Sequence, residues 1–324
     1  MGNIIDMAVY TQVTEAEVWD FLSHYDVGML VSLEPIAEGV TNTNYLLTTD
    51  QNKYILTLFE KHFKLEELPY FTALMGWWSQ RGISCPKPIA NRDGRTLSAL
   101  KEKPAVLVSF LEGDGVKNIT PEHLSQLGTL LAKMHIEGMG FPHTRENALS
   151  LKGWEKLIDT TSERLNEIEP DLRRLILDEY NYLSENWPND LPKGPVHADL
   201  FPDNVFFEKP FGRPLQLTGV IDFYFSCTDY WAYDLAIVVN AWCFDARHRL
   251  VKERVQALME AYNRVRTMSA EEDVSMSLLL RGAALRFLLT RADAWLNPDA
   301  GALVTAKDPL EYVAKLRFFQ SFKS

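Results

Sequence analysis

The chain has 324 residues, of which 46% are hydrophobic and 24% are charged, and its formal net charge is −11 at pH 7. This composition predicts a globular protein with a sizeable core and argues against a disordered chain. The acidic balance argues against a nucleic-acid-binding protein, because phosphate contacts need a basic face. No apolar stretch approaches the roughly 20 residues that cross a bilayer, so we expect no membrane partner.

Two further features predict a cytoplasmic protein. Residues 1–20 lack a basic start followed by an apolar segment, so we expect no secretory leader. Cys85, Cys227 and Cys243 are odd in number and far apart, a pattern typical of reduced thiols.

The first third of the chain predicts a mostly β unit. Residues 14–26 predict a short helix, because Val18, Phe21 and Leu22 recur at helical spacing. From residue 29 onward, short β-branched and aromatic runs alternate with turn-forming residues, which is typical of antiparallel strands. The expected strands cover 31–33, 45–49, 53–60 and 105–111, a second helix is expected at 64–81, and a hairpin-type turn at 91–95.

The pattern becomes helical after residue 111. Thr120 can cap a helix that has Pro121 at its first position and Gly138 at its end. The next helix is expected at 172–187, and helices follow again over 229–321. The change of pattern predicts two domains joined by a short connection. Their expected bounds are 1–111 and 112–324.

The most informative segment is 197–204, which reads His-Ala-Asp-Leu-Phe-Pro-Asp-Asn and precedes a predicted hairpin. Asp199 and Asn204 lie just before the first strand of this hairpin, and Asp222 lies at the end of the returning strand. Because antiparallel pairing brings these two strand ends together, we expect Asp222 beside Asn204. Carboxylate and amide oxygens are ligands suited to Mg²⁺ that bridges phosphates. The sequence therefore predicts a site for magnesium and phosphate.

The spacing of these residues resembles the catalytic loop and metal-binding Asp of the protein-kinase-like phosphotransferases, and the small Ala198 resembles their aminoglycoside/choline kinase branch. The resemblance implies an α+β, two-lobed protein-kinase-like fold, with an antiparallel β N-terminal lobe containing one helix and a mainly helical C-terminal lobe. It implies ATP as co-substrate and Mg²⁺ as cofactor. It makes Asp199 the residue that accepts or orients the substrate hydroxyl, and it makes Asn204 and Asp222 the metal ligands. Two further residues of the motif are expected to be structural: His197 and Asp234.

The same resemblance implies that the N-terminal lobe binds the nucleotide and that the C-terminal lobe carries catalysis and substrate binding. The loop 38–45 corresponds to the family's phosphate-covering loop, and the adenine is expected near 109–111. The family's third strand normally carries a Lys or Arg that binds the phosphates, whereas this chain has Thr57 at the matching position. Lys61 lies too far along the strand to be a simple substitute. The expected nucleotide-binding residues are Gly39, Val40, Asn42, Thr43, Thr57, Ser109 and Leu111.

Segments spread over nearly the whole chain resemble the homoserine kinases of this family. The resemblance implies phosphorylation of L-homoserine to O-phospho-L-homoserine in threonine biosynthesis. An amino-acid acceptor needs an anion for its ammonium group and a cation or N–H donors for its carboxylate. We expect Asp229 and Arg286 in these two roles, and a structural contact between them inside the lobe is the alternative. The resembling segments include 37–45, 54–61, 223–229, 233–244 and 284–287.

Two alternative functions stay open at this point. Trp231 and Trp242 are placed to form an aromatic box for the quaternary ammonium of choline, which would indicate a choline kinase or a related small-alcohol kinase. The absent third-strand Lys would suit a pseudokinase-like regulatory binding module. The complete set of Asp199, Asn204 and Asp222 argues against that last reading, because a protein without catalysis has no need of all three.

Overall fold

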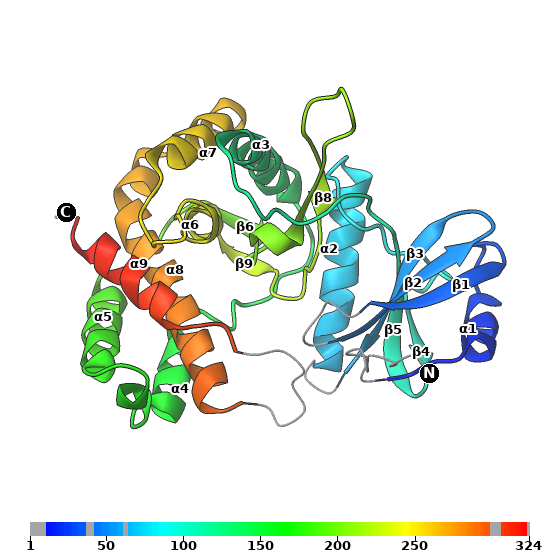
Figure 1. Cartoon of the computed structure of the whole chain (residues 1–324), viewed down its shortest axis with the longest axis horizontal. Helices are drawn as coiled ribbons and strands as arrows, with labels where there is room; N and C mark the ends of the chain where they lie inside the picture. The colour runs from blue at the N-terminus through cyan, green and yellow to red at the C-terminus, as the bar shows by residue number, and fades with distance from the viewer. Residues whose placement is uncertain (1–10, 37–41, 61–63, 299–305, 323–324) are drawn as a thin grey trace. The chain divides into compact units, whose positions relative to one another are not determined.

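The computed structural model describes residues 11–36, 42–60, 64–298 and 306–322 (Figure 1). The chain divides into two compact units, Met1–Glu112 and Gly113–Ser324. The first contains an antiparallel sheet and the second is mainly helical, which is the α+β arrangement expected from the sequence. No helix within the described ranges is long and apolar enough to cross a bilayer.

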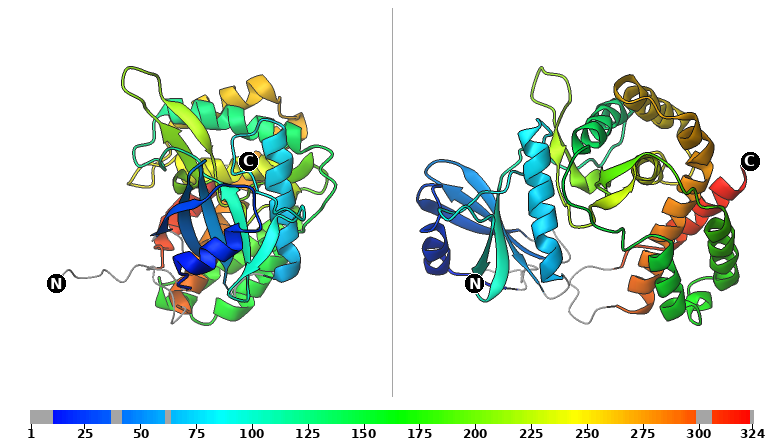
Figure 2. Two further views of the ribbon diagram at one scale, coloured as in Figure 1. Left: turned by 90° about the vertical axis from the view of Figure 1, so that its right-hand side faces the viewer. Right: turned by 180° about the vertical axis from the view of Figure 1, so that it is seen from behind.

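The first unit is built on a five-stranded antiparallel sheet. Its elements are α1 (Glu15–Leu22), β1 (Leu30–Ile36), β2 (Asn42–Thr49), β3 (Lys53–Phe59), α2 (Leu68–Gln80), β4 (Leu97–Leu100) and β5 (Lys103–Ser109). The strand order is β1-β2-β3-β5-β4, and Figures 1 and 2 show the sheet between α1 and α2. In β3, Leu56 and Leu58 belong to the apolar cluster shared with α1. Thr57 therefore points to the opposite face of the sheet.

Two local expectations need correction. A short 3₁₀ turn, Leu65–Glu67, comes first in the expected second helix, so the α-helix begins only at Leu68. The turn at 91–95 is present, but the β4–β5 hairpin closes at Lys101 and Glu102, which both have positive φ. Such a hairpin turn usually contains Gly or Asn, so Lys-Glu gave no turn signal in the sequence.

The second unit places helices around two small two-stranded sheets. Its elements are α3 (Pro121–Gly138), α4 (Leu151–Thr161), α5 (Leu172–Asn186), β6 (Lys193–Val196), β7 (Val205–Glu208), β8 (Gln216–Val220), β9 (Cys227–Tyr230), α6 (Trp231–Trp242), α7 (Lys252–Val265), α8 (Ala270–Leu296) and α9 (Leu310–Gln320). The pairs are β6–β9 and β7–β8, so the hairpin expected after residue 204 is confirmed. The helical run expected over 229–321 instead begins with strand β9. Helix α6 is buried along almost its whole length and lies at the centre of this unit (Figure 1).

Helices α3 and α7 approach each other closely at a glycine. A Cβ atom on Gly128 would lie 2.5 Å from the carbonyl oxygen of Leu258 and 3.2 Å from the amide nitrogen of Tyr262. A side chain at this position would therefore push the two helices apart. Gly76 in α2 differs, because nothing lies within 4 Å of its Cβ position.

All three cysteines are buried free thiols. Cys85 lies in the first unit, and Cys227 and Cys243 lie in the second. Burial raises the pKa of Cys85 and of Cys243 to about 12, and it raises the pKa of Cys227 as well. The side chains therefore behave as small apolar core groups, as the sequence pattern suggested.

Candidate functional site

The β7–β8 hairpin brings the three predicted polar residues together. Val205 pairs with Val220, and the amide of Ile221 donates to the carbonyl oxygen of Asn204 at 3.0 Å. Asp222, the residue after Ile221, therefore lies beside Asn204. The Nδ2 of Asn204 donates to the carbonyl oxygen of Asp199 at 2.8 Å and to its Oδ2 at 3.2 Å. Two carboxylates and one amide thus gather at one end of the hairpin.

Two residues of this region hold left-handed backbone without being glycine. The φ angles are 64° at Ala198 and 63° at Asp222. Each such conformation costs about 1–2 kcal/mol, so the surroundings have to enforce it. The carboxylate of Asp234 accepts hydrogen bonds from the amides of His197 (3.0 Å) and Ala198 (2.8 Å). Asp234 therefore stabilises the sharp turn that precedes Asp199.

Two more side chains from distant helices hold the loop 197–204. The indole Nε1 of Trp242, on α6, donates to the carbonyl oxygen of Leu200 at 2.7 Å. The Nη1 of Arg286, on α8, donates to the carbonyl oxygen of Ala198 at 2.7 Å. The loop makes few hydrogen bonds of regular secondary structure, so these side chains satisfy its buried backbone groups instead. Its position is consequently set by the core of the second unit.

His197 links the loop to the segment that carries Asp222. Its Nδ1 accepts from the amide of Asp199 at 3.3 Å, and its Nε2 contacts the carbonyl oxygen of Ile221 at 2.9 Å. The second contact requires a proton on Nε2 and the first requires a bare Nδ1, so the ring is neutral. Burial lowers the pKa of His197 to about 4. This geometry agrees with the structural role expected for His197.

A chain of buried polar side chains lies behind Asp234. His135 Nε2 lies 3.2 Å from Asp234 Oδ2, and His135 Nδ1 lies 2.7 Å from the hydroxyl of Tyr262. The Nη1 of Arg266 donates to that hydroxyl at 3.0 Å, and its Nη2 binds Glu272. Burial acts to raise the pKa of Asp234, but the hydrogen bond from His135 and the loop amides outweigh it and lower that pKa. The carboxylate therefore stays ionised inside the core.

The sequence analysis did not predict these side-chain contacts behind Asp234. His135 lies on the apolar face of α3, where a histidine has no distinguishing spacing. Tyr262 lies 127 residues further along the chain from His135. The contact between them is a property of helix packing, which sequence patterns of one segment do not reveal.

The site carboxylates have pKa values suited to chemistry near neutral pH. Burial raises the pKa of Asp199 to about 7; the charge of Arg286 opposes this rise, and the neighbouring Asp222 and Asp203 add to it. Burial also raises the pKa of Asp222 to about 6. A carboxyl group with a pKa near 7 can accept a proton efficiently. A desolvated carboxylate such as Asp222 favours a bound cation.

The donor set fits a magnesium ion that also binds phosphate. Because Nδ2 of Asn204 is held by Asp199, its Oδ1 is left for another partner. Asp222 supplies carboxylate oxygens close by. Within the described ranges, no three His, Cys, Asp or Glu side chains gather as a self-sufficient metal site. Two protein ligands plus water and phosphate oxygens are, however, the usual environment of Mg²⁺.

Arg286 is buried and Asp229 is partly exposed, and neither forms an ion pair with another described residue. Asp229 Oδ2 accepts from Asn147 Nδ2 at 2.6 Å, and its Oδ1 accepts from the amide of Tyr230 at 2.7 Å. Among the described residues, no ion pair joins Arg286 to a carboxylate, and its Nε has no hydrogen-bond partner. The structural Asp–Arg contact considered from the sequence is therefore not among the described contacts. The charge of Arg286 still lowers the pKa of Asp229 against the larger effect of burial, which raises it.

The two tryptophans that suggested a choline box are engaged in the core. The ring of Trp231 stacks on His135 with 5.8 Å between centroids, and the guanidinium carbon of Arg266 lies 4.5 Å from the Trp231 centroid. Trp242 is fully buried and donates to Leu200. A ring already stacked on a protein cation is poorly placed to bind a ligand cation. The arrangement therefore argues against a choline site built from this pair.

The residues expected to bind the nucleotide lie in the first unit. Thr57 donates its hydroxyl to Asn44 Oδ1 at 2.7 Å, across the β2–β3 pair. The hydroxyl of Thr43 donates to Glu60 and accepts from the amide of Thr11, so it is already used inside the protein. The Oδ1 of Asn42 accepts from the amide of Glu60 at 3.4 Å. Gly39 and Val40 lie outside the described residues.

At the end of β5, the residues expected to contact adenine differ in their availability. Ser109 exchanges backbone and side-chain hydrogen bonds with Lys87. The backbone of Leu111 makes no hydrogen bond to another described residue, so its N–H and C=O are free for a ligand. Strand β3 has Thr57 at the position where the family normally has a phosphate-binding Lys or Arg. Lys61 lies outside the described residues, and Lys53 pairs with Glu112 at 3.9 Å.

The known proteins to which this chain is similar are phosphotransferases. The model of the phosphotransferase enzyme family matches residues 32–267. A homoserine kinase of Paramagnetospirillum magneticum is 50% identical and covers 97% of both chains. A homoserine kinase of Bradyrhizobium sp. is 49% identical and covers 98% of this chain and 97% of its own. Among solved structures, spectinomycin phosphotransferase in complex with ADP and spectinomycin has a TM-score of 0.69 at 14% identity, covering 95% of each chain.

Proposed function

Because the chain belongs to the phosphotransferase enzyme family, we propose that it transfers the γ-phosphoryl group of ATP to the hydroxyl of L-homoserine. The product is O-phospho-L-homoserine, an intermediate of threonine biosynthesis. The observation that carries the proposal is a set of complementary groups in the second unit, in which the charge of Arg286 acts on both Asp199 and Asp229. A hydroxyl orienter (Asp199), a buried cation (Arg286) and a partly exposed carboxylate without an ion-pair partner among the described residues (Asp229) match the hydroxyl, carboxylate and ammonium groups of homoserine. The relatives named as homoserine kinases support the same acceptor.

Asp199 performs the central role in this mechanism. Its carboxylate orients the homoserine hydroxyl and accepts the proton as the hydroxyl oxygen attacks the γ-phosphorus. The bond from phosphorus to the bridging oxygen breaks, and its electron pair leaves with ADP. Asn204 and Asp222 would hold Mg²⁺, which neutralises phosphate charge when it is bound. The hydrogen bond from Asn204 to Asp199 fixes the proposed metal ligand next to the residue that orients the hydroxyl.

The acceptor is positioned by charge in this proposal. Arg286 binds the homoserine carboxylate through its free Nε and Asp229 binds the ammonium group, each by a charge-assisted hydrogen bond. A ligand that brings both charges offsets the cost of burying them without partners. Asn147 holds Asp229 in place from the neighbouring segment.

The first unit binds the nucleotide in this proposal. The adenine hydrogen-bonds to the free backbone of Leu111 beside Ser109. Gly39, Val40 and Asn42 are the proposed phosphate-binding residues. Thr57 and Thr43 act there through the structure they stabilise, because their hydroxyls are already bonded within the protein.

A coupled assay of ADP release tests the proposed function. The rate of ADP release by purified protein with Mg-ATP is measured under three conditions: with L-homoserine, with choline and without an acceptor. We expect homoserine-dependent release that Asp199→Ala lowers by at least about 10²-fold, the lower end for a positioned acid–base group. Release with choline alone would overturn the acceptor assignment. A drop below tenfold in a folded Asp199→Ala variant would overturn the role of Asp199.

The acceptor pocket is tested by the Michaelis constant for homoserine. Asp229→Asn and Arg286→Lys each remove a charge-assisted hydrogen bond of about 1.5–3 kcal/mol, so we expect KM to rise by roughly tenfold to a hundredfold. Arg281→Lys is the matched control, because Arg281 lies on α8 like Arg286 but binds Glu179 of α5, at 2.6 Å. An unchanged KM in folded Asp229 and Arg286 variants would contradict the assignment.

A further inference from the structure

An exposed lysine lies over the loop that carries Asp199. The Nζ of Lys307 is 3.6 Å from Asp203 Oδ2 and 5.4 Å from the centroid of the Phe201 ring. The Lys307 side chain is 61% exposed and that of Asp203 is 67% exposed. The charge of Lys307 also acts on Asp199, where it opposes the effect of burial on the pKa. Lys307 therefore lies at the solvent side of the candidate site.

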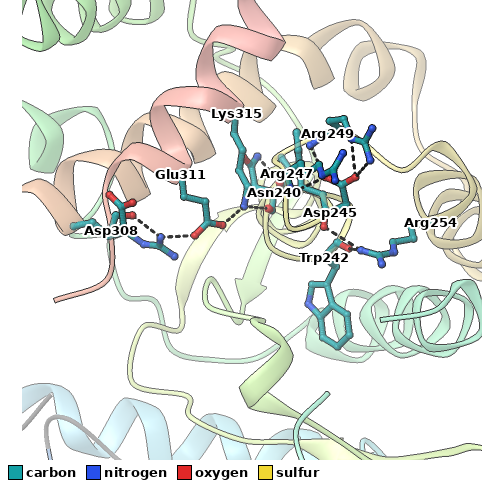
Figure 3. A network of polar contacts seen from close by, with 12 residues as sticks. Asn240, Trp242, Asp245, Arg247, Arg249, Arg254, Asp308, Glu311 and Lys315 are labelled. Atoms are coloured by element: carbon teal, nitrogen blue, oxygen red, sulfur yellow. Dashed lines mark hydrogen bonds and ion pairs between the residues drawn. The ribbon is translucent and has the colours of Figure 1, made fainter. Parts of the chain in front are cut away.

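Polar contacts that run from the surface into the core hold the backbone of Asp308, next to Lys307 (Figure 3). Arg291 Nη1 donates to the carbonyl oxygen of Asp308 at 3.0 Å and to Glu311 Oε2 at 2.6 Å. Lys315 in turn donates to Glu311 and, at 2.8 Å, to the carbonyl oxygen of Asn240 on α6. Lys315 is only 2% exposed, and a buried lysine is stable only when well paired. The start of α9 is thus fixed to α6 and α8, the helices that also hold the loop 197–204.

The ion pair of Lys307 with Asp203 is easily exchanged. Both partners are largely exposed, and such pairs contribute about 0–1 kcal/mol. Arg286 differs, because its Nη1 is bound to the carbonyl oxygen of Ala198 and the proposed function assigns its Nε to the acceptor carboxylate. Lys307 is therefore the cation near Asp199 that can turn to an incoming anion without disturbing the fold.

We propose that Lys307 donates hydrogen bonds to the phosphoryl group during its transfer, an inference that rests on the proposed kinase function. Lys307 lies 3.6 Å from the carboxylate of Asp203 and its charge acts on that of Asp199, and an arriving phosphoryl group adds more negative charge. A cation that hydrogen-bonds to the transferring phosphoryl group stabilises the negative charge of the transition state. Lys307 remains an ammonium group throughout, because the proton of the acceptor hydroxyl goes to Asp199. Arg291 is its positioning residue.

The test uses Lys307→Met, Lys307→Arg and, as matched control, Lys156→Met, an exposed lysine on α4 of the same unit. We expect Lys307→Met to lower kcat by about tenfold to a hundredfold, with KM for homoserine within twofold of wild type and the unfolding midpoint unchanged. Lys307→Arg should recover at least a third of the activity. ATP hydrolysis is also measured without acceptor, and we expect it to fall by a similar factor in Lys307→Met.

Other outcomes would overturn the inference. A raised KM for homoserine with unchanged kcat and unchanged hydrolysis would place Lys307 on the acceptor carboxylate. Equal kcat in Lys307→Met and Lys156→Met would remove Lys307 from the site. The proposed function fails separately, if the wild type releases no ADP with homoserine. The same variants would then be measured with the acceptor that the wild type does use, so the role of Lys307 is still decided.

Discussion

Replacing His197 by glutamine should remove a pH-dependent part of the protein's stability. Burial holds the pKa of His197 at about 4, against an ordinary value of 6.5. As the pH falls, the unfolded chain therefore takes up the proton first. The stabilising contribution of the neutral ring is fully present above pH 6.5 and is lost as the pH falls through about 4. The difference between these pKa values corresponds to about 3 kcal/mol.

The effect has to be measured as a difference between variant and wild type. Asp199 and Asp222 have raised pKa values, so their contribution has the opposite sign: it is present at low pH and is lost as the pH rises towards about 6 and 7. These groups are present in both proteins, so their contributions largely cancel. The free energy of unfolding in urea is measured from pH 7.5 to 4.5 without metal or nucleotide.

We expect the stability gap between wild type and His197→Gln to be largest at pH 7.5 and to shrink by most of about 3 kcal/mol at pH 4.5. His143 is exposed, and His143→Gln is the matched control for the exchange of histidine for glutamine. A gap for His197→Gln that stays constant with pH would refute the reasoning, because burial would then not suppress protonation of the ring.

Two substitutions test how the second unit positions its loop. In Asp234→Asn, an amide group replaces the carboxylate that accepts from backbone N–H groups, including that of Ala198. We expect the free energy of unfolding in urea to fall by about 2–4 kcal/mol and kcat in the ADP-release assay to fall at least tenfold. Gly128→Ala should lower the unfolding free energy by about 1–3 kcal/mol, because its Cβ meets Leu258, whereas Gly76→Ala should raise it by about 0.5–1 kcal/mol. Equal effects of the two glycine changes would contradict the packing argument.

The sequence predicted where Asp199, Asn204 and Asp222 lie better than it predicted the contacts that hold them there. Asp199, Asn204 and Asp222 lie on one short hairpin, so strand pairing alone places them together. Their closeness follows from local rules that operate within about twenty-five residues. The α+β arrangement was also predictable, because strand and helix patterns separate cleanly near residue 112.

The supporting contacts were not predictable for a physical reason. Trp242 and Arg286 bind the loop from α6 and α8, 42 and 88 residues away along the chain. Which side chains meet across such distances depends on helix packing angles, and many packings are compatible with one apolar pattern. Lys307 gave no signal either, because an exposed lysine in a loop is ordinary until its neighbours are known.

The buried cysteines offer a way to measure each unit on its own. A thiol reagent reacts with an exposed thiolate, so a buried thiol becomes labelled only when its surroundings open. Cys85 therefore reports opening of Met1–Glu112, and Cys227 and Cys243 report opening of Gly113–Ser324. Labelling rates read by peptide mass spectrometry would give two opening free energies from the unaltered chain. Adding ATP or homoserine would then identify which unit each ligand stabilises.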